Sequence, residues 1–153
     1  METGDEAPDF SIPDGEGKAV ALREFRGKKV VLYFYPKDDT PGCTIEAVDF
    51  TKLKAEFQKA NTVILGISKD SCESHVKFSK KFGLTVLLLS DSDASVQKMY
   101  GVWRPKKFMG KEFLGTARVT FLIDEKGKIV KTWDPVKPEG HAAEVLEEIR
   151  KMK

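Results

Sequence analysis

The sequence predicts an α/β fold in which helices cover both faces of one mixed β-sheet. Apolar stretches rich in β-branched and aromatic residues alternate with stretches of helical period, as expected for parallel strands joined by right-handed crossovers. Near the end of the chain two strand-like stretches flank a short turn, which adds antiparallel strands at one side of the sheet. The chain has 153 residues, a length that suits a single domain over residues 1–153.

The clearest predicted strand covers residues 28–36, KKVVLYFYP. Its continuous apolar run, ended by proline, is typical of a central strand that is buried on both faces. From residue 43 to about residue 59 the apolar period becomes helical. With about 100° added per residue, one face of this helix carries Cys43, Ala47, Phe50, Leu53 and Phe57.

Two further pairs of strand and helix follow. Residues 61–68 (NTVILGIS) predict a second strand, and residues 71–82 predict a helix with polar cap residues at its start and Gly83 after its end. On this helix His75 is expected to be partly exposed and not to act as a base. Residues 85–91 predict a third strand and residues 93–100 a short helix.

The last third of the chain predicts a hairpin and a terminal helix. Residues 117–124 and 128–133 are typical of two strands around a turn at residues 125–127. Residues 102–115 have the least regular pattern and are expected to form a surface loop. Residues 139–152 predict an amphipathic helix. Its apolar positions are Ala143, Val145, Leu146 and Ile149. Together these elements predict a thioredoxin-like arrangement.

Composition argues against several classes of partner. The net charge of +2 is spread along the chain, so neither nucleic acid nor an acidic membrane is expected to bind. No signal-peptide pattern and no apolar run of about 20 residues is present, which makes the cytoplasm the expected location. The two cysteines and two histidines are too few and too scattered to predict a zinc site, and no dinucleotide or Walker motif predicts a cofactor.

Cys43 lies where a reactive group is expected. In open α/β sheets functional groups gather beyond the carboxyl ends of the strands, and Cys43 follows the loop that leaves the central strand. It also lies in the first turn of the following helix, where unpaired N–H groups and the helix dipole favour a thiolate. Position alone leaves two interpretations open, because a cysteine on the inward face of a helix is also a common small core residue.

The residues around Cys43 resemble a known signature. Residues 36–43, PKDDTPGC, match the PxxxTxxC pattern of peroxiredoxins. The wider match includes APDF near the start of the chain, GISKDSCESHVKF, LLSD, YGVW and ARVTFLIDEKGKI. Along nearly its whole length the sequence resembles the bacterioferritin comigratory protein, or Q-type, peroxiredoxins of the AhpC/TSA superfamily.

The resemblance implies a set of site residues. Cys43 matches the peroxidatic cysteine, and Thr40 the threonine whose hydroxyl bonds the thiolate and the bound peroxide. Pro36 matches the proline that shields the site from water, and Arg118 the distal arginine that stabilises negative charge. Glu46, three residues after Cys43, is a candidate to orient that arginine, although an acid in the first turn of a helix is also favoured by the dipole alone.

The sequence departs from many such proteins at Val48. They carry a second cysteine there, five residues after the first, so the short-range two-cysteine mechanism is excluded in this chain. Cys72 is the remaining candidate for a resolving cysteine, although in some relatives that residue aligns with Ser79. A disulfide between Cys43 and Cys72 would require local unfolding, since neighbouring helix starts are about 10 Å apart. The alternatives are a one-cysteine mechanism with an external thiol and an intermolecular disulfide.

The implied function is that of a thiol-dependent peroxidase in antioxidant defence. It would reduce hydrogen peroxide and organic hydroperoxides through a sulfenic acid at Cys43, with thioredoxin, glutaredoxin or glutathione as the external reductant and no cofactor. Q-type resemblance implies a monomer or weak dimer. The alternatives are a thiol–disulfide oxidoreductase, disfavoured because Thr40 stands where a CxxC motif needs its first cysteine, and a redox sensor without turnover.

Overall fold

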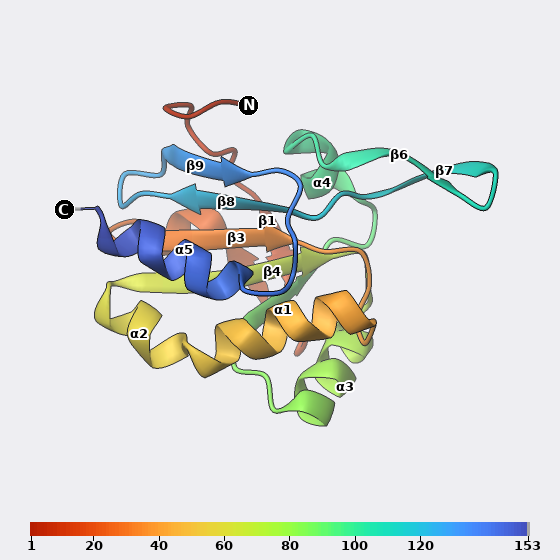
Figure 1. Cartoon of the computed structure of the whole chain (residues 1–153), viewed down its shortest axis with the longest axis horizontal. Helices are drawn as coiled ribbons and strands as arrows, with labels where there is room; N and C mark the ends of the chain where they lie inside the picture. Colours follow the sequence, from red (N-terminus) through yellow and green to blue (C-terminus); the bar gives the residue numbers. More distant parts are fainter. Residues whose placement is uncertain (153) are drawn as a thin grey trace.

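A five-stranded mixed sheet forms the centre of the protein. The computed structural model describes residues 1–152, and its main sheet has the strand order β5-β4-β3-β8-β9 (Figure 1). The three strands β3, β4 and β5 pair in parallel, whereas β8 pairs antiparallel to β3, and β9 antiparallel to β8. Their bounds are β3 (Lys29–Phe34), β4 (Thr62–Ser68), β5 (Leu87–Ser90), β8 (Val119–Ile123) and β9 (Ile129–Trp133).

Helices cover both faces of this sheet, which confirms the predicted thioredoxin-like class. One face packs against α1 (Pro41–Lys52), α2 (Lys54–Lys59), α3 (Cys72–Phe82) and α5 (His141–Arg150) (Figure 1). The other face is covered by α4 (Ser95–Met99), the short helix η1 (Leu22–Phe25) and the N-terminal segment. That segment contains a small hairpin, β1 (Ser11–Pro13) and β2 (Ala19–Ala21), which the sequence pattern did not predict.

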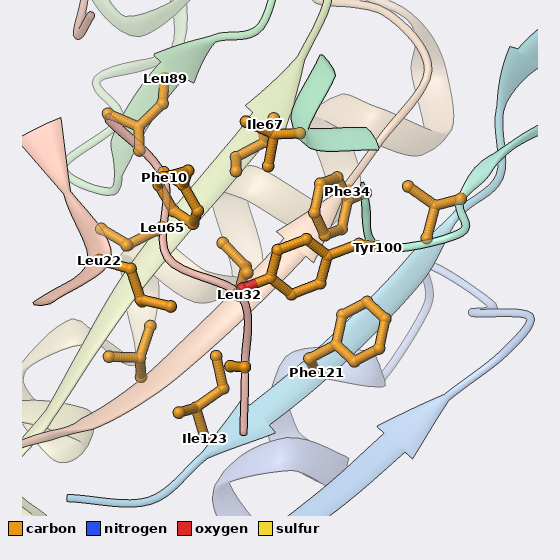
Figure 2. Close-up of a cluster of buried hydrophobic side chains, with 14 of the residues drawn as sticks. Phe10, Leu22, Leu32, Phe34, Leu65, Ile67, Leu89, Tyr100, Phe121 and Ile123 are labelled. Carbon is orange, nitrogen blue, oxygen red and sulfur yellow. The ribbon is translucent and has the colours of Figure 1, made fainter. Parts of the chain in front are cut away.

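The central strand β3 divides the core into two layers. Val31 and Tyr33 pack toward α1 and α5, while Leu32 and Phe34 point into the opposite cluster, which includes Phe10 and Tyr100 (Figure 2). Residues 30–34 of this strand are all buried. The continuous apolar run therefore correctly predicted a strand with no solvent-facing side, since both faces are covered by helices or by the N-terminal segment.

The predicted helix over residues 43–59 forms as two helices. The chain changes direction at Leu53, whose dihedrals of φ −98° and ψ 6° end α1 and begin α2. Leu53 is consequently only half-buried. The other members of its predicted face are buried, namely Cys43, Ala47, Phe50 and Phe57.

The terminal helix confirms three of its four predicted apolar positions. Val145, Leu146 and Ile149 are buried, but Ala142 is buried in place of Ala143, which is exposed. Ala142 and Val145 are three residues apart and lie on the same side of the helix, whereas Ala143 points to solvent.

The prediction of a surface loop over residues 102–115 was wrong. This segment forms a hairpin of β6 (Trp103–Phe108) and β7 (Lys111–Thr116) that extends away from the main sheet (Figure 1). Met109 and Gly110 have positive φ values of 50° and 79°, as a two-residue hairpin turn of the primed kind requires. Three of the six residues of β6 and four of the six residues of β7 are exposed, so the strands lack the alternation of buried and exposed residues that marks a strand in a sequence.

No helix within residues 1–152 is long and apolar enough to cross a membrane.

Candidate active site

The site lies beyond the carboxyl end of β3, where the chain turns into α1. Tyr35 still pairs with β4 through its backbone N–H and the Ile67 carbonyl, 3.1 Å away. Thr40 then takes an extended conformation as the N-cap of α1, and Pro41 occupies the first helical position, where its missing N–H costs nothing. Cys43 is therefore the third helical residue, and it is 1% exposed.

The structure brings Arg118 to Cys43 from 75 residues away in the sequence. Arg118 immediately precedes β8, and the register that pairs Val119 with Phe34 places it beside the end of β3. Its Nη2 donates to Cys43 Sγ at 3.3 Å, and its Nη1 donates to Glu46 Oε1 at 2.8 Å. One guanidinium thus joins the sulfur and the carboxylate, and Glu46 lies where it can orient Arg118.

The electrostatics of this trio depend on burial. Burial raises the pKa of Glu46 to about 7, although the ion pair with Arg118 opposes this rise. Burial would lower the pKa of Arg118, but Cys43 and Glu46 outweigh it and hold that pKa above its usual value. Glu46 Oε2 has no hydrogen-bond partner among the described residues. The guanidinium therefore remains charged beside the sulfur, while Glu46 takes up a proton near neutral pH.

Gly42 allows the first turn of α1 to approach Arg118 closely. A Cβ atom at this position would lie 3.1 Å from Arg118 Nη2 and 3.3 Å from Pro138 Cγ. Both distances are shorter than ordinary van der Waals contacts between such atoms. No local sequence pattern indicates this role of Gly42, because neither Arg118 nor Pro138 is close to it in the chain.

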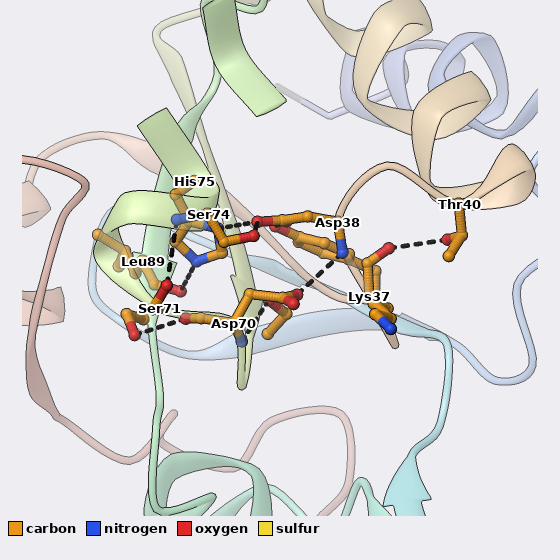
Figure 3. Close-up of polar contacts among 11 residues, drawn as sticks. Lys37, Asp38, Thr40, Asp70, Ser71, Ser74, His75 and Leu89 are labelled. Carbon is orange, nitrogen blue, oxygen red and sulfur yellow. Dashed lines mark hydrogen bonds and ion pairs between the residues drawn. The ribbon is translucent and has the colours of Figure 1, made fainter. Parts of the chain in front are cut away.

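Thr40 and Pro36 lie in the loop that precedes Cys43 in the chain, and both are half-buried. The Thr40 hydroxyl donates to the Lys37 carbonyl at 2.7 Å, so its only hydrogen is used within the loop (Figure 3). Its lone pairs stay available to accept a hydrogen bond. Within residues 1–152 the structure has no hydrogen bond from Thr40 to the Cys43 sulfur, so Thr40 is near Cys43 in the chain without bonding it.

Cys72 is the first residue of α3, and its thiol is free and half-buried. The thiol of Cys43 is also free, but it is buried. The side of α3 that contacts the loop before α1 carries Ser74, which bonds Asp38. Cys72 lies about 160° around the helix from Ser74, about 60° from His75, which also contacts Asp38, and about 20° from Ser79.

His75 was expected to be partly exposed, and this prediction was wrong. It is 1% exposed, because its two ring nitrogens are paired with Asp38 and with the Leu89 carbonyl (Figure 3). A polar side chain at an inward helix position can be buried when each polar atom has a partner. The buried Asp38 was also missed, since a run of polar residues after a strand is usually exposed.

No group of three or more metal-ligating side chains occurs in the described part of the chain.

A buried cysteine at a helix start, paired with a guanidinium at the edge of a thioredoxin-like sheet, defines a thiol-based redox protein. The AhpC/TSA family matches residues 3–132. The putative peroxiredoxin bcp of Coxiella burnetii is 50% identical over 95% of this chain and 97% of its own. Peroxiredoxin Bcp of Bacillus subtilis is 45% identical over 99% of this chain and 97% of its own.

Solved structures agree with these relatives. A cysteine-to-serine mutant of PrxQ from Xylella fastidiosa superposes with a TM-score of 0.93 at 37% identity, over 99% of this chain and 96% of its own. The bacterioferritin comigratory protein of Xanthomonas campestris superposes with a TM-score of 0.88 at 42% identity, over 93% of this chain and 90% of its own. The chain therefore belongs to the AhpC/TSA family and, within it, to the Bcp or Q-type peroxiredoxins. It is a thiol peroxidase.

Proposed function

We propose that Cys43 is the peroxidatic cysteine of this peroxidase. The observation that carries this assignment is the hydrogen bond of 3.3 Å from Arg118 Nη2 to Cys43 Sγ in a buried site. The thiolate attacks the terminal oxygen of a hydroperoxide, and the O–O bond breaks. The sulfur is oxidised to a sulfenic acid, while the departing oxygen leaves as an alkoxide or hydroxide and takes up one proton to form an alcohol or water.

Four other residues support this step in the proposed mechanism. Arg118 stabilises the thiolate and the charge that develops on the departing oxygen, and Glu46 orients Arg118. Thr40 accepts a hydrogen bond from the bound peroxide, for which its lone pairs are available, and Pro36 limits access of water to the sulfur. The support for Arg118 and Glu46 is direct contact, since Arg118 bonds both Cys43 and Glu46. Thr40 and Pro36 are proposed from the signature and from their place in the loop before Cys43.

The proposed substrates are hydrogen peroxide and organic hydroperoxides. This choice draws on the Xanthomonas campestris relative, whose structures concern alkyl peroxide reduction. The proposed reductant is an external thiol, from thioredoxin, glutaredoxin or glutathione. Free thiols at both Cys43 and Cys72 suit a reducing compartment such as the cytoplasm, which is the proposed location. The proposed working form is a monomer or weak dimer.

Replacing the cysteines one at a time tests the assignment. Cys43→Ser is expected to abolish peroxide consumption, because a hydroxyl is far less nucleophilic than a thiolate. Cys72→Ser is the matched control, and it should oxidise at the wild-type rate in the first step. Stopped-flow measurement of peroxide loss reads both variants, and undiminished turnover by Cys43→Ser would overturn the proposal.

The route back to the thiol is tested by intact mass after one equivalent of peroxide. A one-cysteine mechanism predicts a gain of about 16 mass units, one oxygen, on a monomeric chain. A bond between Cys43 and Cys72 instead predicts a loss of about two mass units, because two hydrogens leave. Loss of two mass units in the wild type but not in Cys72→Ser would establish the second outcome.

A further inference from the structure

A buried polar cluster lies beneath the loop that precedes α1, on the side toward α3. Its centre is Asp38, whose Oδ1 accepts from the Tyr35 hydroxyl at 2.6 Å and whose Oδ2 accepts from the Ser74 hydroxyl at 2.8 Å. The same Oδ2 lies 2.7 Å from His75 Nδ1, and His75 Nε2 lies 2.9 Å from the Leu89 carbonyl (Figure 3). The side chains of His75 and Asp38 are only 1% and 3% exposed.

The hydrogen-bond partners of His75 and Asp38 determine how many protons these two side chains hold together. A carbonyl oxygen cannot donate, so His75 Nε2 must carry a hydrogen to bond Leu89. The contact between Nδ1 and Asp38 Oδ2 then requires a single further proton, on either the imidazole or the carboxyl group. In both cases the pair has no net charge, and all of its polar atoms are bonded. Such a satisfied pair is rigid, because the loss of one partner would leave a buried group unpaired.

This pair is also the main attachment of the loop to α3. A groove of about 320 Å³ separates the two, and its lining includes Asp39, Ser74 and Phe78. Among the described residues, the other polar contacts from the loop to α3 are the hydrogen bond from the Ser74 hydroxyl to Asp38 and the ion pair between Asp39 and Lys81. The side chains of Asp39 and Lys81 are 46% and 60% exposed. Exposed ion pairs stabilise weakly, so the buried contacts of Asp38 hold the loop.

The loop in turn orients Thr40 and the start of α1. The Lys37 carbonyl accepts a hydrogen bond from the Thr40 hydroxyl, and Lys37 immediately precedes Asp38 in the chain. Asp39 has a left-handed backbone with φ 58°, so the chain turns sharply between Asp38 and Thr40. The Asp38 N–H is also bonded to Asp70 Oδ2 at 2.9 Å. A shift of Asp38 would therefore move both the Lys37 carbonyl and Thr40, and with them the first turn of α1 that carries Cys43.

We propose that His75 is a positioning residue for the peroxidase reaction, acting through Asp38 on Thr40 and on the first turn of α1. The inference rests on the proposed role of Cys43. It assigns a function to a side chain on a different helix that contacts neither the sulfur nor Arg118. The buried pair holds the loop in place during the attack on the peroxide.

Two substitutions of His75 separate the contact with Asp38 from the contact with Leu89. In His75→Asn the amide takes the place of Nδ1 and can still bond Asp38, whereas in His75→Gln it takes the place of Nε2 and reaches only Leu89. We expect His75→Gln to lower the second-order rate constant for Cys43 oxidation about tenfold, the scale of a small misplacement of reacting groups. His75→Asn should retain most of the rate. The midpoint of the pH dependence of this rate should move upward in His75→Gln, because the loosened turn holds the thiolate less well.

Ser71→Ala is the matched control on the same helix. It removes the N-cap hydrogen bond of 3.1 Å from the Ser74 N–H to Ser71 Oγ and destabilises α3 without touching Asp38. Its rate constant and pH midpoint should equal those of the wild type. If His75→Gln does not fold by circular dichroism, Ser74→Ala removes the neighbouring donor to Asp38 and should lower the rate about threefold.

Equal rates and equal pH midpoints for His75→Gln, His75→Asn and the wild type would overturn the proposal, as would the same loss in Ser71→Ala. The Cys43→Ser variant keeps the two proposals apart. If Cys43→Ser is inactive while the folded His75→Gln matches the wild type, only the positioning role fails. If Cys43→Ser keeps its activity, the assignment of Cys43 itself fails.

Discussion

Gly42 shows how a single missing side chain shapes the contact between Cys43 and Arg118. It occupies the second position of α1, and its backbone lies against the guanidinium. A methyl group there would be 3.1 Å from Arg118 Nη2 and 3.3 Å from Pro138 Cγ, so one of these neighbours would have to move by a few tenths of an ångström. The guanidinium is the atom group that also bonds Cys43 and Glu46, and any shift acts on both bonds.

We therefore expect Gly42→Ala to lower the rate constant for Cys43 oxidation by about tenfold while the protein stays folded. Alanine favours a helix over glycine by about 1 kcal/mol, which offsets the crowding. Stopped-flow kinetics and urea unfolding of the same sample check the two halves of this expectation. A matched substitution is Ile45→Ala, which changes an exposed position of α1 and should leave the rate unchanged. A wild-type rate in Gly42→Ala would contradict the close approach.

At the scale of elements, antiparallel pairing of β8 with β3 is what assembles the site. Arg118 ends the segment that leads from the hairpin β6–β7 into β8, and the β8 register sets its distance from α1. The parallel pairing of β4 with β3 places the start of α3 at the same edge of the sheet. Three elements far apart in the chain thus meet beyond the end of β3, as parallel and mixed α/β sheets allow.

The hairpin β6–β7 is the element that differs most from what its sequence predicts. Phe108, Phe113 and Leu114 are 67%, 49% and 57% exposed, so their apolar side chains do not mark a buried face. Pairing of the two strands depends on backbone hydrogen bonds and on the turn at Met109 and Gly110. A pattern method looks for one buried side, and this hairpin has none over most of its length.

For the whole molecule, two buried groups with opposite pKa shifts make stability depend on pH in opposite ways. Burial raises the pKa of Glu46 to about 7 from its usual 4.5, against the opposing effect of Arg118. Burial also lowers the pKa of His141 below its usual 6.5, with a smaller contribution from Arg118, although Glu144 opposes this. The folded protein thus binds more protons at Glu46, and fewer at His141, than the unfolded chain does.

The signs of the two contributions follow from linkage. The contribution of Glu46 to the free energy of unfolding is on the order of 3 kcal/mol. It is fully present below pH 4.5 and is lost as the pH rises to about 7. The contribution of His141 runs the other way, because stability is lost as pH falls below 6.5 and the unfolded histidine takes up a proton. Between pH 4.5 and 6.5, a rise in pH therefore lowers stability through Glu46 and increases it through His141.

We expect Glu46→Gln to remove the falling contribution, so that its stability rises more steeply with pH than that of the wild type between pH 4.5 and about 7. His141→Gln should remove the rising contribution and show the opposite change. Urea unfolding at several pH values measures both, with equal m-values as the control for two-state behaviour. Parallel curves for Glu46→Gln and the wild type would show that Glu46 does not titrate in this range.

Local patterns in the chain are enough to predict the class of fold, the order of the main strands and helices, and the candidate nucleophile. These features depend on local periodicity, on the buried central strand and on the short signature from Pro36 to Cys43. Arg118 was identified only through the resemblance, since an isolated arginine before a strand carries no local signal.

The side chains that share the site, and those buried beneath it, are brought together by tertiary contacts. The contact of Arg118 with Cys43 and Glu46, the space that Gly42 leaves and the buried pair of Asp38 with His75 all join residues from different elements. Burial of a polar residue depends on partners that are distant in the chain, and the sequence around His75 contains neither Asp38 nor Leu89. Strand pairing and register set these contacts, and they exist only once the sheet has formed.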